Sequence, residues 1–418
     1  MTKTRIDAPI DAPIDTPIDT AALRAHFPAL ELGVAYFDGP GGSQVPDVVA
    51  RAVAGTLTAG VANRGRVTAA ERVADDTVLA ARAAMADLLG ADPDGIVFGR
   101  SMTALTFDVA RTLAAGWAPG DEIVVTRLDH DANIRPWLIA ADRAGVSVRW
   151  AEFDPATGEL PAEAVQAVIT PRTRLVAVTA ASNLLGTRPD VPAITRAAQE
   201  VGALTYVDAV HAAAHVPLDA VALGADLLVC SPYKFLGPHC GVLAGRVDLL
   251  QTLHPDKLLP SSDAVPERFE LGTLPYELLA GTTAAVDFLA TLAGQAHRVA
   301  GDRRQQLVAA LTAVDEHEQR LRRRIEAGLA ELPGVTVHSR AARRTPTLLL
   351  TFAEHAPTAA YHFLAERGIN APAGSFYAIE ASRALGLGDG GGLRVGLAPY
   401  VDDDDVDRLL AGLAEFLS

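Results

Sequence analysis

The sequence predicts an α/β protein whose large domain holds a mainly parallel, seven-stranded sheet and whose smaller C-terminal domain is α+β. Two observations lead to this fold class. Short β-rich runs alternate with Ala-rich helical stretches between residues 36 and 245, which is typical of a parallel sheet covered by helices. A long helical stretch over residues 275–332 then precedes a second set of strands and helices. The 418 residues, 49% of them hydrophobic, are enough to bury a sizeable core.

The N-terminal residues have a different character from the rest of the chain. Residues 6–20 read IDAPIDAPIDTPIDT, with proline at every fourth position. Proline at this spacing prevents a helix, and the segment offers little apolar surface to bury. We therefore predict a disordered tail over residues 1–20.

Seven short β-rich runs are the expected strands of the large sheet. They cover residues 96–98, 122–126, 146–150, 174–179, 204–208, 226–230 and 241–244. Sheets of this kind bind ligands beyond the carboxyl ends of their strands. The polar residues just after these runs are therefore the candidates for a functional site.

The second set of elements indicates the smaller domain. We expect strands over residues 335–338, 347–352 and 393–397, and helices over residues 358–367 and 404–417. Residues 402–405 are four consecutive aspartates. Acidic side chains at a helix start satisfy free N–H groups and the helix dipole, so we predict a helix start there and no metal site.

Charge and hydropathy argue against two kinds of partner. The net charge is −15, and the only dense basic run lies at residues 320–324. Glu316 and Glu318 precede arginines of this run by four residues, which is the spacing of helical ion pairs. We therefore expect a solvated helix face and no nucleic-acid binding. No apolar run approaches the ~18 residues that span a bilayer, so we expect no membrane association.

Cysteine and lysine usage is sparse. The two cysteines, Cys230 and Cys240, are too few for a disulfide framework, and the N-terminus lacks the layout of a signal peptide, so a cytoplasmic location is expected. The three lysines are Lys3, Lys234 and Lys257. Lys234 lies in an apolar stretch, and lysine, unlike arginine, can form a Schiff base.

Asp208 and Lys234 are the central candidates for chemistry. Asp208 ends one expected strand and Lys234 follows the next, so both are expected at the same edge of a parallel sheet. The pair is either a simple ion pair or part of a pyridoxal 5'-phosphate (PLP) site. In a PLP site the lysine binds the cofactor and the aspartate keeps the pyridine nitrogen protonated.

Other residues after strands fit the same site, although each also has a structural interpretation. His130 can stack on a flat ring and move protons, or it can be a structural histidine. Asn183 can donate to a ring hydroxyl, or it can be a turn residue. Met102 and Thr103 open a helix whose N-terminus can bind phosphate, or it can be simply capped.

Six motifs together make the sequence resemble a known family, the class V aminotransferases or cysteine desulfurase-like proteins of PLP fold type I. The motifs are YFDGPGG from residue 36, DHDAN from residue 129, SNLLGT from residue 182, VDAVH from residue 207, SPYK from residue 231 and RVGL from residue 394. The resemblance runs from about residue 36 to residue 417. It implies PLP on Lys234, Asp208 at the pyridinium nitrogen and His130 stacked on the ring.

The resemblance also implies further binding residues and a second subunit. Asn183 and His211 would contact the ring hydroxyl, and His211 stands where the family often has glutamine. Arg394 would hold the carboxylate of a small amino-acid substrate. Thr273 resembles a phosphate contact supplied by the partner, which implies a homodimer with active sites at the subunit interface. The implied phosphate ligands within the chain are Met102, Thr103, Ser231 and Tyr233.

The expected domain boundaries follow from the pattern and the resemblance together. Residues 21–35 are expected as an N-terminal segment that packs with the small domain. Residues 36–280 are expected to form the large PLP-binding domain, and residues 281–418 the small C-terminal domain.

The sequence differs from the persulfide-forming members of this family in lacking one cysteine, and this difference determines which reaction we expect. Desulfurases that form a persulfide carry a cysteine in the loop after the small-domain helix, and residues 371–380 contain none. We therefore expect α,β-elimination by a C–S lyase acting on a cysteine-like amino acid. An aminotransferase or amino-acid epimerase is the alternative. A PLP-binding protein without turnover is the third reading, and the joint presence of Lys234, Asp208, His130 and Arg394 argues against it.

Overall fold

The structure is a computed structural model that describes residues 18–293 and 301–418. The tail predicted for residues 1–20 lies outside the described residues except for its last three. Of these, Ile18 is buried, and Asp19 caps helix α1 (Thr20–Arg24) by accepting a hydrogen bond from Ala22 N at 3.0 Å.

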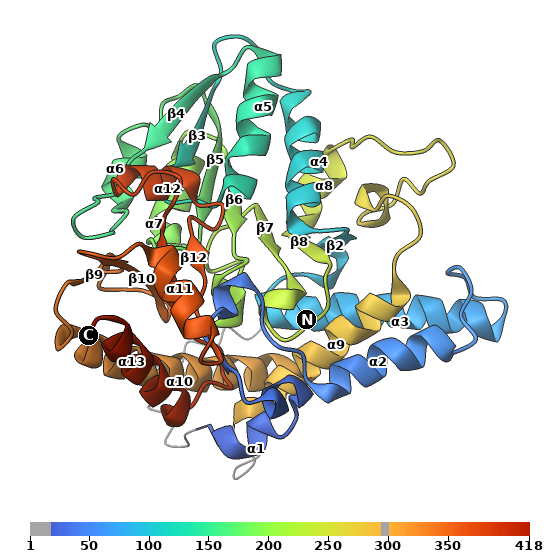
Figure 1. Cartoon of the computed structure of the whole chain (residues 1–418). Helices are drawn as coiled ribbons and strands as arrows, with labels where there is room; N and C mark the ends of the chain where they lie inside the picture. The colour runs from blue at the N-terminus through green and yellow to red at the C-terminus, as the bar shows by residue number, and fades with distance from the viewer. Residues whose placement is uncertain (1–17, 294–300) are drawn as a thin grey trace.

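A seven-stranded sheet forms the centre of the molecule and confirms the predicted fold class (Figure 1). Its strand order is β2-β8-β7-β6-β5-β3-β4, and β8 is antiparallel to both of its neighbours. The chain returns from β7 to β8 through a short turn over residues 231–240 rather than through a crossover helix, which is why β8 runs the other way. The strands are β2 (Ile96–Gly99), β3 (Glu122–Thr126), β4 (Ser147–Ala151), β5 (Thr173–Thr179), β6 (Leu204–Asp208), β7 (Leu227–Cys230) and β8 (Gly241–Gly245).

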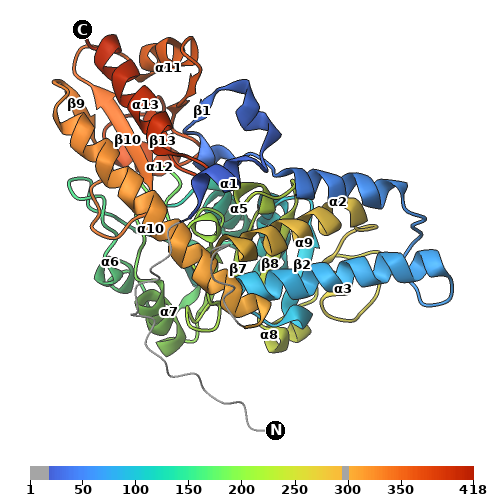
Figure 2. The same ribbon diagram turned by 90° about the horizontal axis from the view of Figure 1, so that it is seen from below.

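Helices cover both faces of this sheet because successive strand residues point to opposite sides. In β3, Ile123 and Val125 belong to a core shared with α4 (Met102–Ala114) and α5 (Arg135–Ala144). Val124 faces the other core, which includes residues of α3 (Ala69–Leu89) and α7 (Val191–Glu200). Helix α9 (Tyr276–Ala290) packs with both α3 and α2 (Asp47–Thr58), as Figure 2 shows from below. The shorter helices are α6 (Ala162–Gln166) and α8 (Val247–Thr252).

The C-terminal part contains a four-stranded antiparallel sheet. Its order is β12 (Ala373–Gly374), β13 (Gly392–Gly396), β10 (Thr347–Phe352) and β9 (Val335–Val337). The helices of this part are α10 (Arg303–Ala330), α11 (Pro357–Ala365), α12 (Ile379–Ala384) and α13 (Asp403–Phe416). Asp402 caps α13 by accepting a hydrogen bond from Asp405 N at 2.9 Å, in agreement with the predicted helix start.

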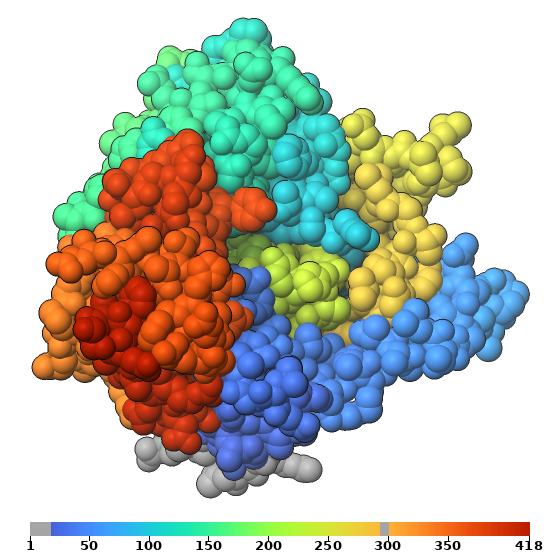
Figure 3. All heavy atoms as spheres, viewed as in Figure 1, coloured from blue at the N-terminus to red at the C-terminus, as the bar shows by residue number. Residues whose placement is uncertain are grey.

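The N-terminal segment lies against the C-terminal part of the chain, and the two are side by side in Figure 3. Strand β1 (Ala35–Tyr36) pairs in parallel with β11 (Ile369–Asn370). Arg24 donates to Asp405 at 2.7 Å and to Tyr400 O at 2.7 Å. Strands of two residues are too short to produce a periodic pattern, so the sequence did not predict this pairing.

Helix α10 agrees only in part with the solvated face predicted around residues 320–324, because Arg320 and Arg323 are exposed whereas Arg322 is buried. Arg320 pairs with Asp403 at 2.9 Å rather than with a glutamate one turn earlier. Glu318 is fully buried and binds His215 at 2.8 Å. Arg322 does pair within the helix, with Glu326 one turn later at 2.6 Å, whereas Arg320 and Glu318 bind partners from other elements. No helix in the described part of the chain is long and apolar enough to cross a bilayer.

Candidate active site

A cavity at the carboxyl edge of the large sheet gathers polar side chains that follow five different strands. A second, wider cavity adjoins it and shares Thr103, His130, Asn183, Tyr233 and Lys234 with it. The structure brings all the candidate residues to these two cavities except Thr273. Arg394 lines the second cavity. The first is lined by Met102 and Thr103 after β2, His130 after β3, Asn183 after β5, Asp208 at the end of β6, His211 after β6, and Ser231, Tyr233 and Lys234 after β7.

Lys234 lies in the turn between β7 and β8, with its amine inside the cavity. Its Nζ donates a hydrogen bond to Pro40 O and lies 4.8 Å from the centre of the Tyr233 ring. Burial lowers the pKa of Lys234 to about 7, and the nearby cation of Arg394 acts in the same direction. An amine with this pKa is partly neutral near neutral pH and is therefore a nucleophile and a base.

Asp208 is the last residue of β6, and only 4% of its surface is exposed. Its Oδ1 accepts a hydrogen bond from Val210 N at 2.9 Å. Burial raises the pKa of Asp208 to about 6, whereas the cation of Lys234 opposes the rise. A buried carboxylate of this kind is most stable beside a cation, so the position suits a protonated ring nitrogen.

His130 and Asn183 line both cavities at the ends of β3 and β5. His130 Nδ1 accepts a hydrogen bond from Ala132 N at 3.0 Å, and burial lowers the pKa of His130 to about 4. The imidazole is therefore neutral at physiological pH and suited to stacking on a flat ring. Asn183 Nδ2 donates to Phe376 O at 3.0 Å, while its Oδ1 is buried without a hydrogen-bond partner.

The N-terminus of α4 opens into the first cavity through Met102 and Thr103. Ser101 caps the helix by accepting a hydrogen bond from Ala104 N at 3.1 Å. Gly241 of β8 passes directly beneath this turn, and a Cβ atom at Gly241 would collide with Ser101 and Met102. The free N–H groups at this helix end form a site for an anion such as phosphate.

Arg394 of β13 lies in the wall of the wider cavity and is 2% exposed. Its Nη1 donates to Asn183 O at 3.1 Å, its guanidinium lies 3.7 Å from the centre of the Phe376 ring, and its Nε is buried without a partner. Burial lowers the pKa of Arg394 to about 9. A buried guanidinium with an unpartnered N–H is suited to a carboxylate ligand.

Residues 371–380 supply two cavity residues that sequence reasoning missed. Phe376 and Tyr377 line the wider cavity, and both have left-handed backbone, with φ of 52° and 59°. Tyr377 O accepts a hydrogen bond from Asp131 N at 2.7 Å, as Phe376 O does from Asn183, and these bonds hold the strained turn in place. Their position in the loop after the small-domain helix is the signal in the sequence that points to them.

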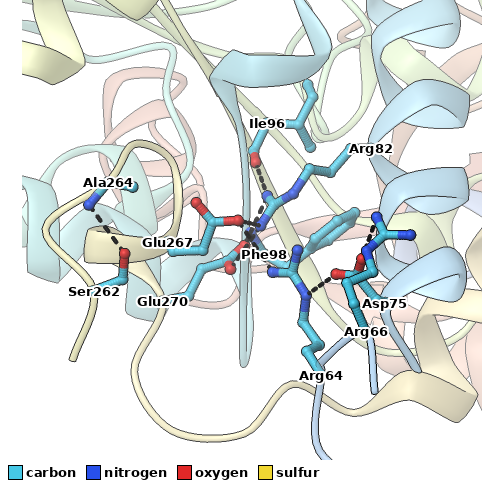
Figure 4. Close-up of polar contacts among 10 residues, drawn as sticks. All are labelled: Arg64, Arg66, Asp75, Arg82, Ile96, Phe98, Ser262, Ala264, Glu267 and Glu270. Carbon is cyan, nitrogen blue, oxygen red and sulfur yellow. Dashed lines mark hydrogen bonds and ion pairs between the residues drawn. The ribbon is translucent and has the colours of Figure 1, made fainter. Parts of the chain in front are cut away.

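Thr273 is the one candidate that does not line either cavity. It is exposed in the segment that leads into α9. Three residues earlier, Glu270 forms a buried ion pair with Arg82 of α3, with Oε1–Nη1 at 3.0 Å and Oε2–Nη2 at 2.8 Å (Figure 4). Glu270 also accepts a hydrogen bond from Phe98 N at 2.9 Å. The base of this segment is thus fixed on α3 and β2.

The donor set of the cavity fits PLP. A buried carboxylate, an amine of lowered pKa and a helix N-terminus lie around one space, where they match the ring nitrogen, the aldehyde and the phosphate of the cofactor. Asn183 Oδ1 and His211 Nδ1 are both buried without partners among the described residues, which marks the same space as the position of a polar ligand.

Comparison with known proteins gives one consistent result. The family model described as aminotransferase class-V matches residues 35–409. A protein of Mycobacterium tuberculosis described as uncharacterized protein MT3887 is 36% identical over 94% of this chain and 98% of its own length. A probable cysteine desulfurase of Pseudomonas aeruginosa is 33% identical over 93% of this chain and 96% of its own. The crystal structure of the cysteine desulfurase CsdA from Escherichia coli superposes with a TM-score of 0.84 at 28% identity, covering 96% of this chain and all of that one.

Proposed function

Because the chain belongs to the class-V aminotransferase family, we propose that it is a PLP-dependent C–S lyase that acts on a cysteine-like amino acid by α,β-elimination. The family consists of PLP enzymes, and the cavity offers each group that the cofactor needs. Lys234 would bind PLP, Asp208 would hold its ring nitrogen, and His130 would cover one ring face. When bound, PLP supplies the electron sink that lets an amino acid lose its α-proton.

Lys234 is the group placed to move that proton. Its pKa of about 7 means that its Nζ can accept a proton and return it near neutral pH. His130 has a pKa of about 4 and stays neutral, so it orients the ring without adding a charge. Asp208 would stay ionised beside a protonated ring nitrogen, which reverses the effect of burial on its pKa.

Arg394 is placed to bind the substrate carboxylate. Its Nε lacks a partner, and Asn183 O and the Phe376 ring fix the guanidinium in the cavity wall. A bidentate contact would orient the α-carbon toward Lys234, which shares the wider cavity. The substrate class that fits is therefore an α-amino acid with a free carboxylate.

The absence of a thiol from the lining of both cavities is the observation that favours elimination over persulfide transfer. Among the described residues, the lining loop carries Phe376 and Tyr377, and both cysteines are buried elsewhere. Burial raises the pKa of Cys240 to about 11 and raises that of Cys230 as well. Neither thiol is poised to become a thiolate that could attack a substrate sulfur.

Two further features bear on the proposed oligomeric state and cellular location of the enzyme. Thr273 lies outside the cavities of its own chain, which favours a homodimer in which each subunit lends Thr273 to the phosphate site of the other. The two free cysteines are compatible with a reducing cytoplasm.

Product analysis tests the proposed reaction. The protein loaded with PLP is incubated with cysteine, cystine and cysteine S-conjugates, and the products are identified. Elimination gives pyruvate, ammonia and a released sulfur compound in equal amounts. Alanine as the product would instead show desulfuration, and an oxo acid formed only with an amino acceptor would show transamination.

A cysteine double variant supplies the second arm of this test. We expect Cys230→Ala/Cys240→Ala to keep most of the wild-type turnover, because neither thiol lines the cavities. Loss of turnover in a double variant that still folds and binds PLP would contradict the elimination proposal.

A further inference from the structure

The wider cavity has more room than the amino-acid part of a substrate needs. Its volume is about 580 Å³, within the range of roughly 300–1,000 Å³ that is typical of clefts for drug-sized molecules. Asp208 and Met102, which would meet the ring nitrogen and the phosphate of the cofactor, line the first cavity only. Much of the wider cavity is therefore open to the side chain of a substrate whose carboxylate lies on Arg394.

Flat and apolar side chains bound this additional space. Phe107 lies on α4 one turn after Thr103, and Pro136 is the second residue of α5. Phe376 and Tyr377 line the same cavity from the loop that precedes α12. Aromatic rings attract other flat groups in offset or edge-on arrangements, and apolar walls exclude water. A substituent that fits among these side chains is therefore itself apolar and flat.

The charged side chains at this end of the cavity pair with each other. Arg135 of α5 donates to Asp131, with Nη2–Oδ1 at 3.1 Å. Lys234 and Arg394 are the other lysine or arginine residues among the described lining residues, and both are assigned to the amino-acid part of the substrate. A charged substituent would lose its water without gaining a partner, which is unfavourable.

Tyr377 is held in an unfavourable backbone conformation at the edge of this space. Its φ of 59° is left-handed, a region that glycine enters far more readily than tyrosine does. Its ring centre lies 5.5 Å from that of His130, and 75% of the residue is exposed, so the ring adds little to core packing. Strained residues of this kind are typical of ligand contacts.

We propose that the substrate is an S-substituted cysteine with an apolar, flat substituent, and that Tyr377 determines this specificity by packing against the substituent. The inference rests on the proposed lyase function and names its substrate class. Lys234 takes the α-proton, the Cβ–S bond breaks, and the sulfur keeps the bonding electrons and then receives that proton. The substituent leaves as a thiol, and water converts the remaining three-carbon fragment to pyruvate and ammonia. No group has to reach the sulfur, so a bulky substituent on it is no obstacle.

Two uncharged substrates of different size test the preference. The kcat/KM for pyruvate formation by the PLP-loaded protein is measured with S-benzyl-L-cysteine and with S-methyl-L-cysteine, which both release an alkyl thiolate. We expect the benzyl compound to be favoured by about tenfold or more, because its ring buries more apolar surface.

Binding without turnover gives a second measurement of the same preference. The compounds 3-(benzylthio)propanoate and 3-(methylthio)propanoate keep the carboxylate and the thioether but lack the amine, so they cannot react. Isothermal titration of the PLP-loaded protein should give the benzyl compound the lower Kd, again by about tenfold or more.

Substitutions of Tyr377 connect the preference with its ring. Tyr377→Ala is expected to lower the benzyl-to-methyl ratio by about threefold or more in both measurements, because one aromatic contact is lost. Tyr377→Phe keeps the ring and should keep the wild-type ratio. Tyr361→Ala is the matched control, since Tyr361 is a half-buried tyrosine of α11 that lines neither cavity. We expect this control to keep the wild-type ratio as well.

The outcomes separate this inference from the proposed function. Equal benzyl and methyl values in the wild type, or a full benzyl preference in Tyr377→Ala, would overturn the inference and leave the lyase function standing. A wild type that forms pyruvate from neither conjugate and forms alanine from cysteine would instead overturn the proposed function.

Discussion

At the scale of single residues, the two cavities are lined by ionisable side chains whose charged forms are destabilised by burial. Lys234 and Arg394 both have lowered pKa values, about 7 and about 9, and Asp208 has a raised pKa of about 6. Such groups reduce the stability of the protein without a ligand, and a ligand of complementary charge relieves the cost. The candidate side chains thus share an unfavourable environment as well as a position at the sheet edge.

Lys234 provides a direct test of this cost. Its pKa is about 7 in the folded chain and ~10.4 in the unfolded chain, so the unfolded state binds more protons between these values. The cofactor-free wild type should therefore gain stability as the pH rises from about 7 to about 10. Lys234→Met should lack this rise and be more stable at pH 7 by roughly 1–4 kcal/mol in urea unfolding.

Lys257 supplies the control for that measurement. Its side chain is 21% exposed and pairs with Asp263 at 3.1 Å near the surface. Lys257→Met should leave the pH dependence as it is in the wild type. Equal pH profiles for Lys234→Met and the wild type would show that Lys234 does not titrate in this range.

At the scale of elements, the segment before α9 is held by a buried ion pair. Arg82 binds the Glu270 carboxylate through Nη1 and Nη2, and each of the two side chains is 4% exposed. Removing one partner leaves a buried charge unpaired, so Arg82→Met should cost about 3–5 kcal/mol in the free energy of unfolding. Arg383→Met, which breaks the exposed Arg383–Asp389 pair, should cost less than about 1 kcal/mol. Similar losses of unfolding free energy in Arg82→Met and Arg383→Met would contradict the claim that burial makes the Arg82–Glu270 pair more costly to break.

Much of the element pattern could be predicted from the sequence because it depends on local periodicity. Each of the seven expected runs falls on a strand of the large sheet, with no end shifted by more than one residue. The short strands β1, β11 and β12 were not predicted, because two residues carry no periodic signal. Glu318 was expected on a solvated face, but its buried contact with His215 is made across elements, which helical spacing cannot reveal.

The candidate site was predictable where chemistry depends on residue type and on position after a strand. Lys234, Asp208 and His130 meet in one cavity as that rule requires. Phe376 and Tyr377 were missed because a left-handed turn without glycine has no clear sequence signature. The contacts of His211 with Thr345 and Thr347 join residues that are more than 130 positions apart, which a local pattern cannot reveal.

At the scale of the whole molecule, the proposal requires a second subunit for a complete site. Lys234→Ala removes the lysine that we propose holds the cofactor, and Thr273→Glu places a negative charge where the partner's phosphate would lie. Each variant alone should have little activity. Mixing the two should restore about a quarter of the wild-type activity, because half of the dimers are mixed and each has one intact site.

The mixing experiment has a clear negative outcome. If Thr273 acted only within its own chain, a mixed dimer would contain no intact site, and activity would not return. Sedimentation of both variants before and after mixing shows whether subunits have exchanged, so an absence of exchange is not mistaken for an absence of complementation.

The central claim, that Lys234 holds the cofactor, is tested most directly by reduction with borohydride followed by peptide mapping. Reduction fixes a lysine-bound cofactor as a stable amine, and the chain offers only Lys3, Lys234 and Lys257 as candidates. We expect the pyridoxyl group on the peptide that contains Lys234, and no labelled peptide from Lys234→Ala. Labelling of Lys3 or Lys257 alone, or the same yield of label in Lys234→Ala as in the wild type, would contradict the account.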